Sequence, residues 1–184
     1  LPKGFRDSLP AELAPRQRIV SKLVATFQRY GFDPLETPAA ERIETLMGKY
    51  GEEGDQLIFK ILKRGEKAAT GEADLALRYD LTVPLARVVA IHGDLPRPFK
   101  RYQVQPVWRA DKPQKGRYRE FIQCDVDVVG SASPLVEIEL LSMTDGVFRD
   151  LGFTDHRVRV NNRQLLSGMI RAAGVPASLE VSAI

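Results

Sequence analysis

The chain has 184 residues, 43% hydrophobic and 28% charged, with a formal net charge of +3, which suits one compact domain with a substantial core. Its single cysteine excludes an internal disulfide framework and fits a reducing cytoplasm, and its two histidines, far apart and without a cysteine cluster, predict no zinc site. The sequence shows neither an apolar run long enough for a membrane helix nor a secretory signal pattern, so we expect a cytoplasmic protein that does not enter a membrane.

The first half of the sequence predicts helices and short strands separated by glycine and proline. Apolar residues recur at helical spacing from Ile19 to Phe27, Pro15 is tolerated in a first helical turn, and Gly31 favours a stop. In chain order the patterns predict a loop over residues 1–10, a helix over 15–30, a strand over 32–37, a helix over 40–49, a Gly/Glu loop over 51–54, a strand over 56–63, a turn over 65–71, an antiparallel return strand over 74–80 and a helix over 83–92.

The second half predicts a long hairpin followed by two helices. In chain order we expect strands over residues 99–109 and 117–129, a helix beginning at Ser133-Pro134 and ending at Gly152, a short strand over 158–160, and a helix capped by Asn162 and ended by Gly174 that directs Leu165, Leu166, Met169 and Ile170 inward. Residues 176–184 show no ending pattern, so we expect the chain to be cut there. Hairpins mixed with helices, with few helix-sized crossovers, favour an α+β fold with an antiparallel β-sheet flanked by helices.

The loop between the two long strands concentrates positive charge around a proline and a glycine. Its five cations are Arg109, Lys112, Lys115, Arg117 and Arg119. One interpretation is a solvated basic hairpin without a special role. The other is a phosphate site, because planar guanidinium groups grip phosphate oxygens with two hydrogen bonds at once. The second interpretation predicts a nucleoside triphosphate as a ligand.

The strand after this loop has two different faces, since side chains alternate along a strand. One face is apolar and must be core: Ile122, Cys124, Val126 and Val128. The other bears Phe121, Gln123, Asp125, Asp127 and Val129. Spacing alone fits a half-solvated strand equally well. The neighbouring arginines favour a polar floor that recognises a small molecule by hydrogen bonds.

Asp80 and Thr82 place an acid and a hydroxyl two residues apart at a strand end. Asp80 is expected either to cap the following helix or, together with Thr82, to bind an ammonium group. Cys124 is expected to be inert core, and His92 and His156 are interpreted as surface residues without a role.

Four segments carry a resemblance to a known family: Gly4-Phe5-Arg6-Asp7, residues 44–51, residues 77–84 and residues 116–125. Together they resemble the histidyl-tRNA synthetases, which are class II aminoacyl-tRNA synthetases, over essentially the whole chain. The helix ending at Tyr30-Gly31 and the strand up to Pro38 resemble motif 1, the class II dimer element. Residues 109–121 resemble motif 2. The resemblance implies the class II catalytic core and a homodimer formed through motif 1.

The resemblance also implies roles for individual residues in forming histidyl-adenylate from histidine and ATP and in passing the histidyl group to tRNA(His). Arg109 would be catalytic, bridging the histidine carboxylate and the α-phosphate. The implied contacts of the other residues are Asp111 near adenine, Arg117 on the γ-phosphate, Asp80, Thr82 and Gln123 on the α-ammonium group, Asp127 on the imidazole, and Lys112 and Gln114 near the tRNA acceptor end. Mg²⁺ would accompany the ATP without an assignable protein ligand, and no tightly bound prosthetic group is implied.

The sequence departs from the family pattern after residue 184. Members continue with a second histidine-binding motif, motif 3 and an anticodon-binding domain, none of which is in these residues. We therefore expect residues 1–174 to be the motif 1 and motif 2 part of the core, and residues 175–184 to begin a truncated insertion. We expect a fragment with little or no activity of its own.

Two rival interpretations stay open. One is the catalytically silent paralogue that regulates ATP-phosphoribosyltransferase in histidine biosynthesis and resembles the synthetase core. The other is a free-standing dimerisation or binding module of the same fold. The cationic loop favours a synthetase, since a regulator needs no grip on a triphosphate.

Overall fold

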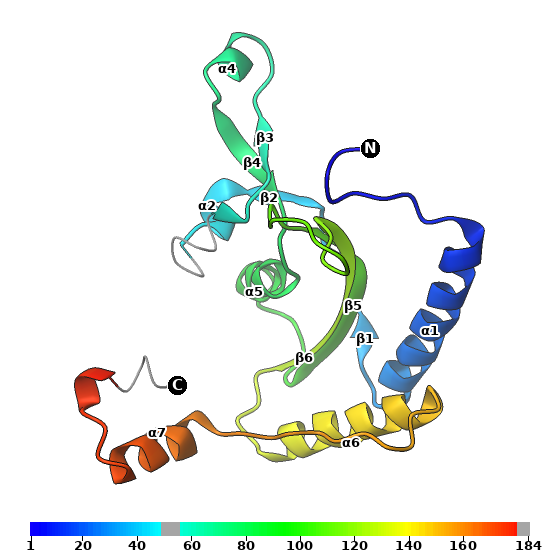
Figure 1. The fold of residues 1–184 in the computed structure, drawn as a ribbon, viewed down its shortest axis with the longest axis vertical. Helices are drawn as coiled ribbons and strands as arrows, with labels where there is room; N and C mark the ends of the chain where they lie inside the picture. The colour runs from blue at the N-terminus through cyan, green and yellow to red at the C-terminus, as the bar shows by residue number, and fades with distance from the viewer. Residues whose placement is uncertain (49–55, 180–184) are drawn as a thin grey trace.

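The computed structural model of the chain describes residues 1–48 and 56–179, and the predicted loop at 51–54 lies outside them. Its elements are α1 (Pro10–Arg29), β1 (Asp33–Pro34), β2 (Ala40–Arg42), α2 (Ile43–Leu46), β3 (Lys60–Leu62), α4 (Glu66–Ala69), β4 (Ala73–Leu77), α5 (Thr82–Ile91), β5 (Phe99–Trp108), β6 (Glu120–Val129), α6 (Leu135–Asp150), α7 (Arg163–Ala172) and the 3-10 turn η1 (Ala177–Leu179). The curved β5–β6 hairpin occupies the centre, with α1 and α6 on one side and α5 on the other (Figure 1).

The strands of the described residues form two three-stranded sheets. The first has the order β1-β5-β6, with β1 parallel to β5 and β5 antiparallel to β6 from Phe99↔Val129 to Trp108↔Glu120. The second has the order β2-β4-β3 and is antiparallel throughout. The α+β prediction is confirmed. The structure divides the predicted antiparallel pairing between two sheets and adds one short parallel pairing, because β1 lies beside β5 after the end of α1.

The main core lies between the β5–β6 hairpin, α1 and α6. Its buried members are Phe27, Phe32, Tyr102 and Met143. Cys124, Val126 and Val128 of β6 pack against this cluster, as expected for that strand. Ile122, expected on the same core face, is 42% exposed, because it lies near the start of β6 and outside this cluster. One face of the hairpin therefore packs in the core, and the opposite face is the one that can carry a functional site.

The start of the first helix was predicted five residues too late. α1 begins at Pro10, and Pro15 lies inside it. Proline at the first helical position costs little, because that residue has no intrahelical hydrogen-bond partner in any case. At Pro15 the helix gives up one such bond. Its apolar stripe, which ends at the buried Phe27, keeps the helix packed on the sheet.

Several short elements also differ from prediction. Residues 40–46 form β2 and the single turn α2 instead of a helix, because β2 pairs with β4 at Ala40↔Leu77 and a distant partner overrides local preference. The strand expected at 32–37 shrinks to Asp33–Pro34, the strands expected at 56–63 and 74–80 shrink to β3 and β4, and the turn at 65–71 contains α4. Residues 158–160 have no strand partner in the described chain.

The last two helices are placed well but packed differently from expectation. Asn162 Oδ1 accepts the N–H groups of Gln164 and Leu165, as predicted for the cap of α7. Ser133 Oγ accepts the Leu135 N–H, but α6 begins one residue later than predicted, with Pro134 and not Ser133 in the cap position. However, the prediction that the apolar side of α7 faces inward is wrong, since Leu165 and Met169 are both 61% exposed.

His156 is the one histidine whose surface assignment is wrong. Its side chain is only 15% exposed, and Nε2 lies 2.9 Å from Asp145 Oδ1. Nδ1 lies 3.1 Å from the Phe153 carbonyl oxygen, and the ring stacks on Phe148. The imidazole therefore packs against the C-terminal part of α6 and the residues that follow it, instead of facing water.

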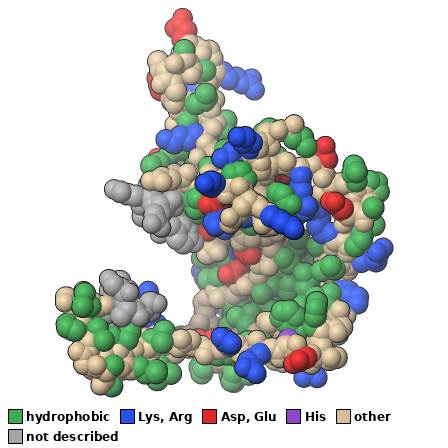
Figure 2. All heavy atoms as spheres, viewed as in Figure 1, with side chains coloured by type: hydrophobic (Ala, Val, Ile, Leu, Met, Phe, Trp, Pro, Cys, Tyr) green, Lys and Arg blue, Asp and Glu red, His purple; other side chains and the backbone are tan. Residues whose placement is uncertain are grey.

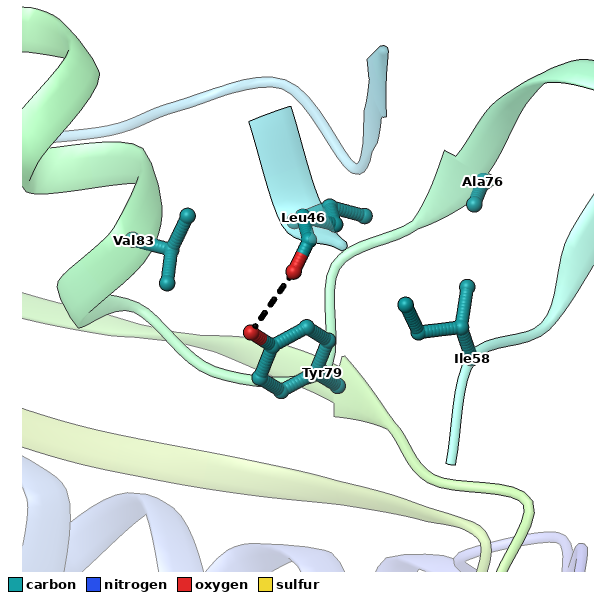
Figure 3. Close-up of a cluster of buried hydrophobic side chains, with 5 residues drawn as sticks. All are labelled: Leu46, Ile58, Ala76, Tyr79 and Val83. Atoms are coloured by element: carbon teal, nitrogen blue, oxygen red, sulfur yellow. Dashed lines mark hydrogen bonds between the residues drawn. The ribbon is translucent and has the colours of Figure 1, made fainter. Parts of the chain in front are cut away.

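A second apolar cluster anchors the connection between β4 and α5. It consists of Leu46, Ile58, Ala76, Tyr79 and Val83 (Figure 3). The Tyr79 hydroxyl donates to the Leu46 carbonyl at 3.1 Å, as the dashed line in Figure 3 marks. This bond fixes the backbone of Tyr79, whose carbonyl faces the polar side of the β5–β6 hairpin.

Within the described residues, no helix is both long and apolar enough to cross a membrane.

Candidate active site

The polar side of the β5–β6 hairpin carries a ladder of polar side chains from both strands. Residues directly opposite each other in an antiparallel pair point to the same face of the sheet. The register places Arg101 opposite Asp127, Gln103 opposite Asp125, and Gln105 opposite Gln123. The polar face expected for β6 therefore exists, and β5 contributes as much to it. Figure 2 shows Lys and Arg side chains gathered around the loop end of this hairpin.

Arg109 lies on this polar face, at the end of β5. Its Nε donates to the Tyr79 carbonyl at 2.9 Å, and its Nη2 donates to Gln123 Oε1 at 3.3 Å. The guanidinium carbon lies 5.1 Å from the centre of the Phe121 ring. These contacts orient the guanidinium group before any ligand arrives.

Gln123 continues the polar chain toward the acids. Its Nε2 donates to Asp125 at 3.0 Å for Oδ2 and 3.2 Å for Oδ1. A side-chain amide can both accept and donate, so Gln123 links the cation Arg109 to the anion Asp125. Arg109, Gln123 and Asp125 thus form one hydrogen-bonded row.

Asp127 is held by an arginine that the sequence analysis did not single out. Arg101 is fully buried, and its Nη2 lies 2.7 Å from Asp127 Oδ2. Burial raises the pKa of Asp127 above its usual range, and the positive charge of Arg101 opposes this rise. Burial also lowers the pKa of Arg101. The alternation Arg101, Gln103, Gln105 along β5 was the signal that could have revealed this residue.

Asp80 and Thr82 stand where the chain enters α5. Asp80 is buried, and its Oδ1 accepts the Val83 N–H at 3.2 Å, so the helix-capping interpretation is confirmed. Asp80 also acts electrostatically on both Arg101 and Asp127. It therefore belongs to the same charged neighbourhood as the hairpin face. Thr82 is the first residue of α5 and is exposed.

The cationic loop folds back on itself. Arg117 contacts Asp111 Oδ2 through Nη2 at 2.9 Å and Nε at 3.1 Å. Gln114 and Arg117 exchange backbone hydrogen bonds across a tight turn in which Gly116 has a φ of +80°, a conformation that favours glycine. Lys112 and Gln114 are exposed at the tip. Asp111 and Arg117, two of the three residues expected to contact ATP, are thus paired with each other.

The N-terminal segment packs on the base of this loop. The Arg119 N–H donates to the Gly4 carbonyl at 2.8 Å, and Arg119 Nε donates to the Asp111 carbonyl at 2.9 Å. A Cβ at Gly4 would lie 2.7 Å from the Arg119 side chain, so glycine allows this approach. Arg6 covers the Tyr118 ring at 4.3 Å.

A second buried arginine, also missed by the sequence analysis, fixes the backbone beneath the site. Arg78 donates to the carbonyl oxygens of Thr37, Pro38 and Pro106 and to Gln105 Oε1. Burial lowers its pKa. Its partners are mostly backbone oxygens, so its role is to join three chain segments.

The candidate site is the polar face of the hairpin, on which Arg101 is buried and the Asp127 side chain is 30% exposed. A cavity of about 580 Å³ lies between α6 and the start of α7, and one of about 280 Å³ lies beside Arg6, Arg16 and Tyr118. Neither is lined by Arg109, Gln123 or Asp127. In the described part of the chain, no group of three or more His, Cys, Asp or Glu residues could hold a metal ion.

Comparisons with known proteins point to one family. The profile of the histidyl-tRNA synthetase family matches residues 4–183. The chain is 53% identical to a histidine–tRNA ligase of Gloeobacter violaceus, covering 98% of this chain and 43% of that protein. It is 50% identical to a histidine–tRNA ligase of Cytophaga hutchinsonii, covering 97% of this chain and 43% of that protein. The chain thus spans less than half the length of the curated relatives that it matches.

Solved structures give the same result. The crystal structure of histidyl-tRNA synthetase from Nostoc sp. PCC 7120 superposes with a TM-score of 0.83 at 33% identity, covering 99% of this chain and 39% of that chain. An ATP phosphoribosyltransferase regulatory subunit/histidyl-tRNA synthetase from Bacillus halodurans gives a TM-score of 0.70 at 28% identity, covering 83% of this chain and 38% of that chain.

Proposed function

The chain belongs to the histidyl-tRNA synthetase family, and we propose that it supplies the adenylate-forming face of a histidine–tRNA ligase. In the first step a histidine carboxylate oxygen attacks the α-phosphorus of ATP, and the bond to pyrophosphate breaks. In the second step a ribose hydroxyl at the 3′ end of tRNA(His) attacks the carbonyl carbon, and AMP leaves. Both steps need anionic groups to be brought together and held.

The observation that carries this proposal is that Arg109 and the acids of β6 lie on one face of the hairpin. Arg109 bonds to Gln123, which bonds to Asp125. These contacts and the one to Tyr79 engage part of the five-donor guanidinium fork, which leaves donors for a ligand. A fixed cation between a carboxylate and a phosphate lowers their repulsion and stabilises charge that grows on the phosphoryl oxygens. We therefore assign Arg109 as the catalytic residue.

The polar face supplies groups of the right kind for histidine. Asp80, Thr82 and Gln123 offer oxygen acceptors that we assign to the α-ammonium group. Asp127 is assigned to the imidazole, where its carboxylate accepts the ring N–H. An amino acid without a ring N–H would leave this half-buried carboxylate without its partner, and sites of that kind discriminate by about 10⁴–10⁵-fold.

The cationic loop is assigned to ATP, with Asp111 near the adenine and Arg117 on the γ-phosphate. Their mutual contact does not oppose this assignment. The Arg117 side chain is more than half exposed, and a surface ion pair of this kind contributes only about 0–1 kcal/mol. A charge-assisted contact with phosphate is worth about 1.5–3 kcal/mol, so ATP can displace the pair. Mg²⁺ would enter bound to the triphosphate.

The remaining assignments concern partners. The exposed tip of the loop, with Lys112 and Gln114, is assigned to the acceptor end of tRNA(His). We further propose a homodimer formed through α1 and β1, and a cytoplasmic location where ATP and tRNA are available. Residues 1–174 would form the motif 1 and motif 2 part of the catalytic core, and residues 175–184 the start of an insertion.

The regulatory paralogue is kept as the second candidate, because the Bacillus halodurans structure carries both names. The arginines of the cationic loop support the synthetase. Pyrophosphate exchange separates the two in the full-length protein given histidine, ATP and Mg²⁺. A synthetase exchanges label into ATP only when histidine is present, whereas a regulator binds histidine and exchanges nothing. Absence of exchange from a folded, histidine-binding protein would overturn the proposal.

A further inference from the structure

Arg101 is the most deeply buried charge of the hairpin and the nearest cation to Asp127. It is fully buried, although arginine is rarely buried without a specific partner. It lies directly opposite Asp127 in the β5–β6 register, so both side chains emerge from the polar face. Nothing in the proposed function described above uses this residue.

The contacts of Arg101 tie the site to two elements. Nη1 donates to Gln103 Oε1 at 3.2 Å, and Nη2 donates to the Leu81 carbonyl at 3.3 Å. Leu81 immediately precedes α5, so the guanidinium group bridges β5 to the entry of that helix. The remaining close contact of Nη2 is Asp127 Oδ2 at 2.7 Å.

The contact between Arg101 and Asp127 is held by charge and leaves hydrogen-bonding capacity unused. Arg101 Nε and Asp127 Oδ2 are both buried and have no aligned hydrogen-bond partner among the described residues. The Asp127 side chain nevertheless keeps 30% of its surface exposed. Because Oδ2 is turned into the protein, a ligand must approach the carboxylate from its other oxygen.

Among the charges around Asp127, the positive charge of Arg101 favours its ionised form. Asp125 on the same strand and Asp80 before α5 both favour protonation of Asp127, as burial does, and Arg101 opposes them. The other nearby cation, Arg109, is engaged with Gln123 and the Tyr79 carbonyl. Three acids thus share one buried cation.

We propose that Arg101 is a positioning residue that holds Asp127 ionised and turns one of its oxygens outward, so that the site accepts a hydrogen bond from a substrate ring N–H. This inference rests on the proposed function, which assigns Asp127 to the imidazole. A protonated Asp127 would present a donor on one oxygen and would bind an N–H less well. Arg101 therefore sets side-chain specificity without touching the substrate.

The test separates ionisation from simple structural support. Histidine itself titrates between about pH 5 and 8. The pH profile of pyrophosphate exchange is therefore measured in the full-length protein with β-(1,2,4-triazol-3-yl)alanine, an analogue whose less basic ring stays neutral over this range. Removing the cation raises the pKa of Asp127, so Arg101→Gln should move the acid limb of kcat/KM to higher pH by about one unit or more. The KM for the analogue should rise about tenfold, and the KM for ATP should change less than about twofold.

Arg78→Gln is the matched control. Arg78 is as buried as Arg101, but its partners are backbone oxygens, the Thr37 hydroxyl and Gln105 instead of the acids of the site. It should lower stability without moving the acid limb. An acid limb that stays at the wild-type pH in Arg101→Gln, or that moves equally in Arg78→Gln, overturns the inference.

A double-mutant cycle keeps the test decisive if Arg101→Gln does not fold. Arg101→Lys retains the charge but loses the fork that reaches Leu81 and Asp127 together. It should raise the KM for the analogue severalfold in the wild-type background and hardly at all in the Asp127→Asn background, because Arg101 acts through that carboxylate. Equal effects in both backgrounds would refute it. A wild-type protein without histidine-dependent exchange would instead refute the proposed function.

Discussion

Arg109 owes its position to a tyrosine whose side chain is buried in the second core cluster. Its Nε bonds to the Tyr79 carbonyl, and the Tyr79 hydroxyl is fixed in turn by the Leu46 carbonyl in the second core cluster. The second nitrogen then meets Gln123 on the neighbouring strand. A group that is oriented before the reaction stabilises developing charge without the cost of reorganising at that moment.

Replacing Arg109 should therefore remove transition-state stabilisation more than substrate binding. In the full-length protein, Arg109→Ala is expected to lower kcat for histidine-dependent pyrophosphate exchange by about 10²–10³-fold, with an unchanged circular dichroism spectrum. Arg109→Lys should recover only part of the loss, because an ammonium group cannot form the planar fork. Turnover within about twofold of wild type for Arg109→Ala would remove its catalytic role.

Asp127→Asn tests the imidazole assignment in the same assay. A hydrogen bond to a charged group is worth about 1.5–3 kcal/mol, so the KM for histidine should rise about 10- to 150-fold while the KM for ATP stays nearly constant. Asn keeps the size of the side chain and removes its charge. Equal losses for histidine and ATP would place Asp127 outside the imidazole pocket.

Cys124 should be chemically silent. Burial, with a smaller effect of Asp125, raises the pKa of its thiol to about 11, and the residue packs on the core side of β6. At pH 8 only a small fraction is thiolate, which is the reactive form. Alkylation by iodoacetamide should be slow in the folded chain and fast in urea, and rapid labelling of the folded chain would show that β6 is not packed as described.

At the scale of elements, the β5–β6 hairpin separates the hydrophobic core from the candidate site. One face packs on α1 and α6 through Phe27, Tyr102 and Met143. The opposite face carries the polar ladder, and a shift of pairing by one residue would exchange the two faces completely. The packing of α1 and α6 therefore does more than stabilise the fold, because it fixes which side chains face a ligand.

Met143→Ala tests how strongly α6 holds this arrangement. Met143 is 2% exposed in the main core, so the substitution is expected to lower the free energy of unfolding by about 2–5 kcal/mol. Leu135→Ala on the same helix is the control, since Leu135 is 69% exposed and should cost less than about 0.5 kcal/mol. Urea denaturation of the chain followed by circular dichroism measures both, and equal losses would contradict the assignment of the core.

At the scale of the whole molecule, the described chain presents apolar surface that its own elements do not cover. Leu165 and Met169 of α7 and Ile138 of α6 are largely exposed. The chain also spans less than half the length of its curated relatives. Within the described residues, the candidate site lies on one face of a sheet, where the Asp127 side chain is 30% exposed and the Arg117 side chain 56% exposed, and contact with water weakens the interactions of such charges.

We therefore expect the isolated 184-residue chain to catalyse poorly. Given histidine, ATP and Mg²⁺, it should exchange pyrophosphate at least about 10²-fold more slowly than the full-length protein, because exclusion of water and completion of the site supply much of the rate. Side-by-side exchange assays at equal concentration check this, with circular dichroism to verify that the chain is folded. Exchange at the full-length rate would show that this face alone is sufficient.

Local patterns predicted the features that depend on neighbours in sequence. The apolar positions Cys124, Val126 and Val128 of β6, the cap at Asn162 and the turn at Gly116 follow from side-chain periodicity and capping, and the structure agrees with each. The predictions failed where distant partners decide. Residues 40–42 form a strand because they pair with β4. Leu165 and Met169, on the apolar side of α7, stay exposed among the described residues.

The sequence by itself determined which residue types were available: a loop of arginines, a strand with Gln and Asp on one face, and an apolar opposite face. Only the tertiary structure decided that Arg101 and Asp127 stand opposite each other, that Asp80 lies in the same charged neighbourhood, and that Tyr79 supports Arg109. Charge pairs of this kind join positions that are far apart along the chain. Their effect depends on distance and burial, and both are set by packing instead of by local sequence.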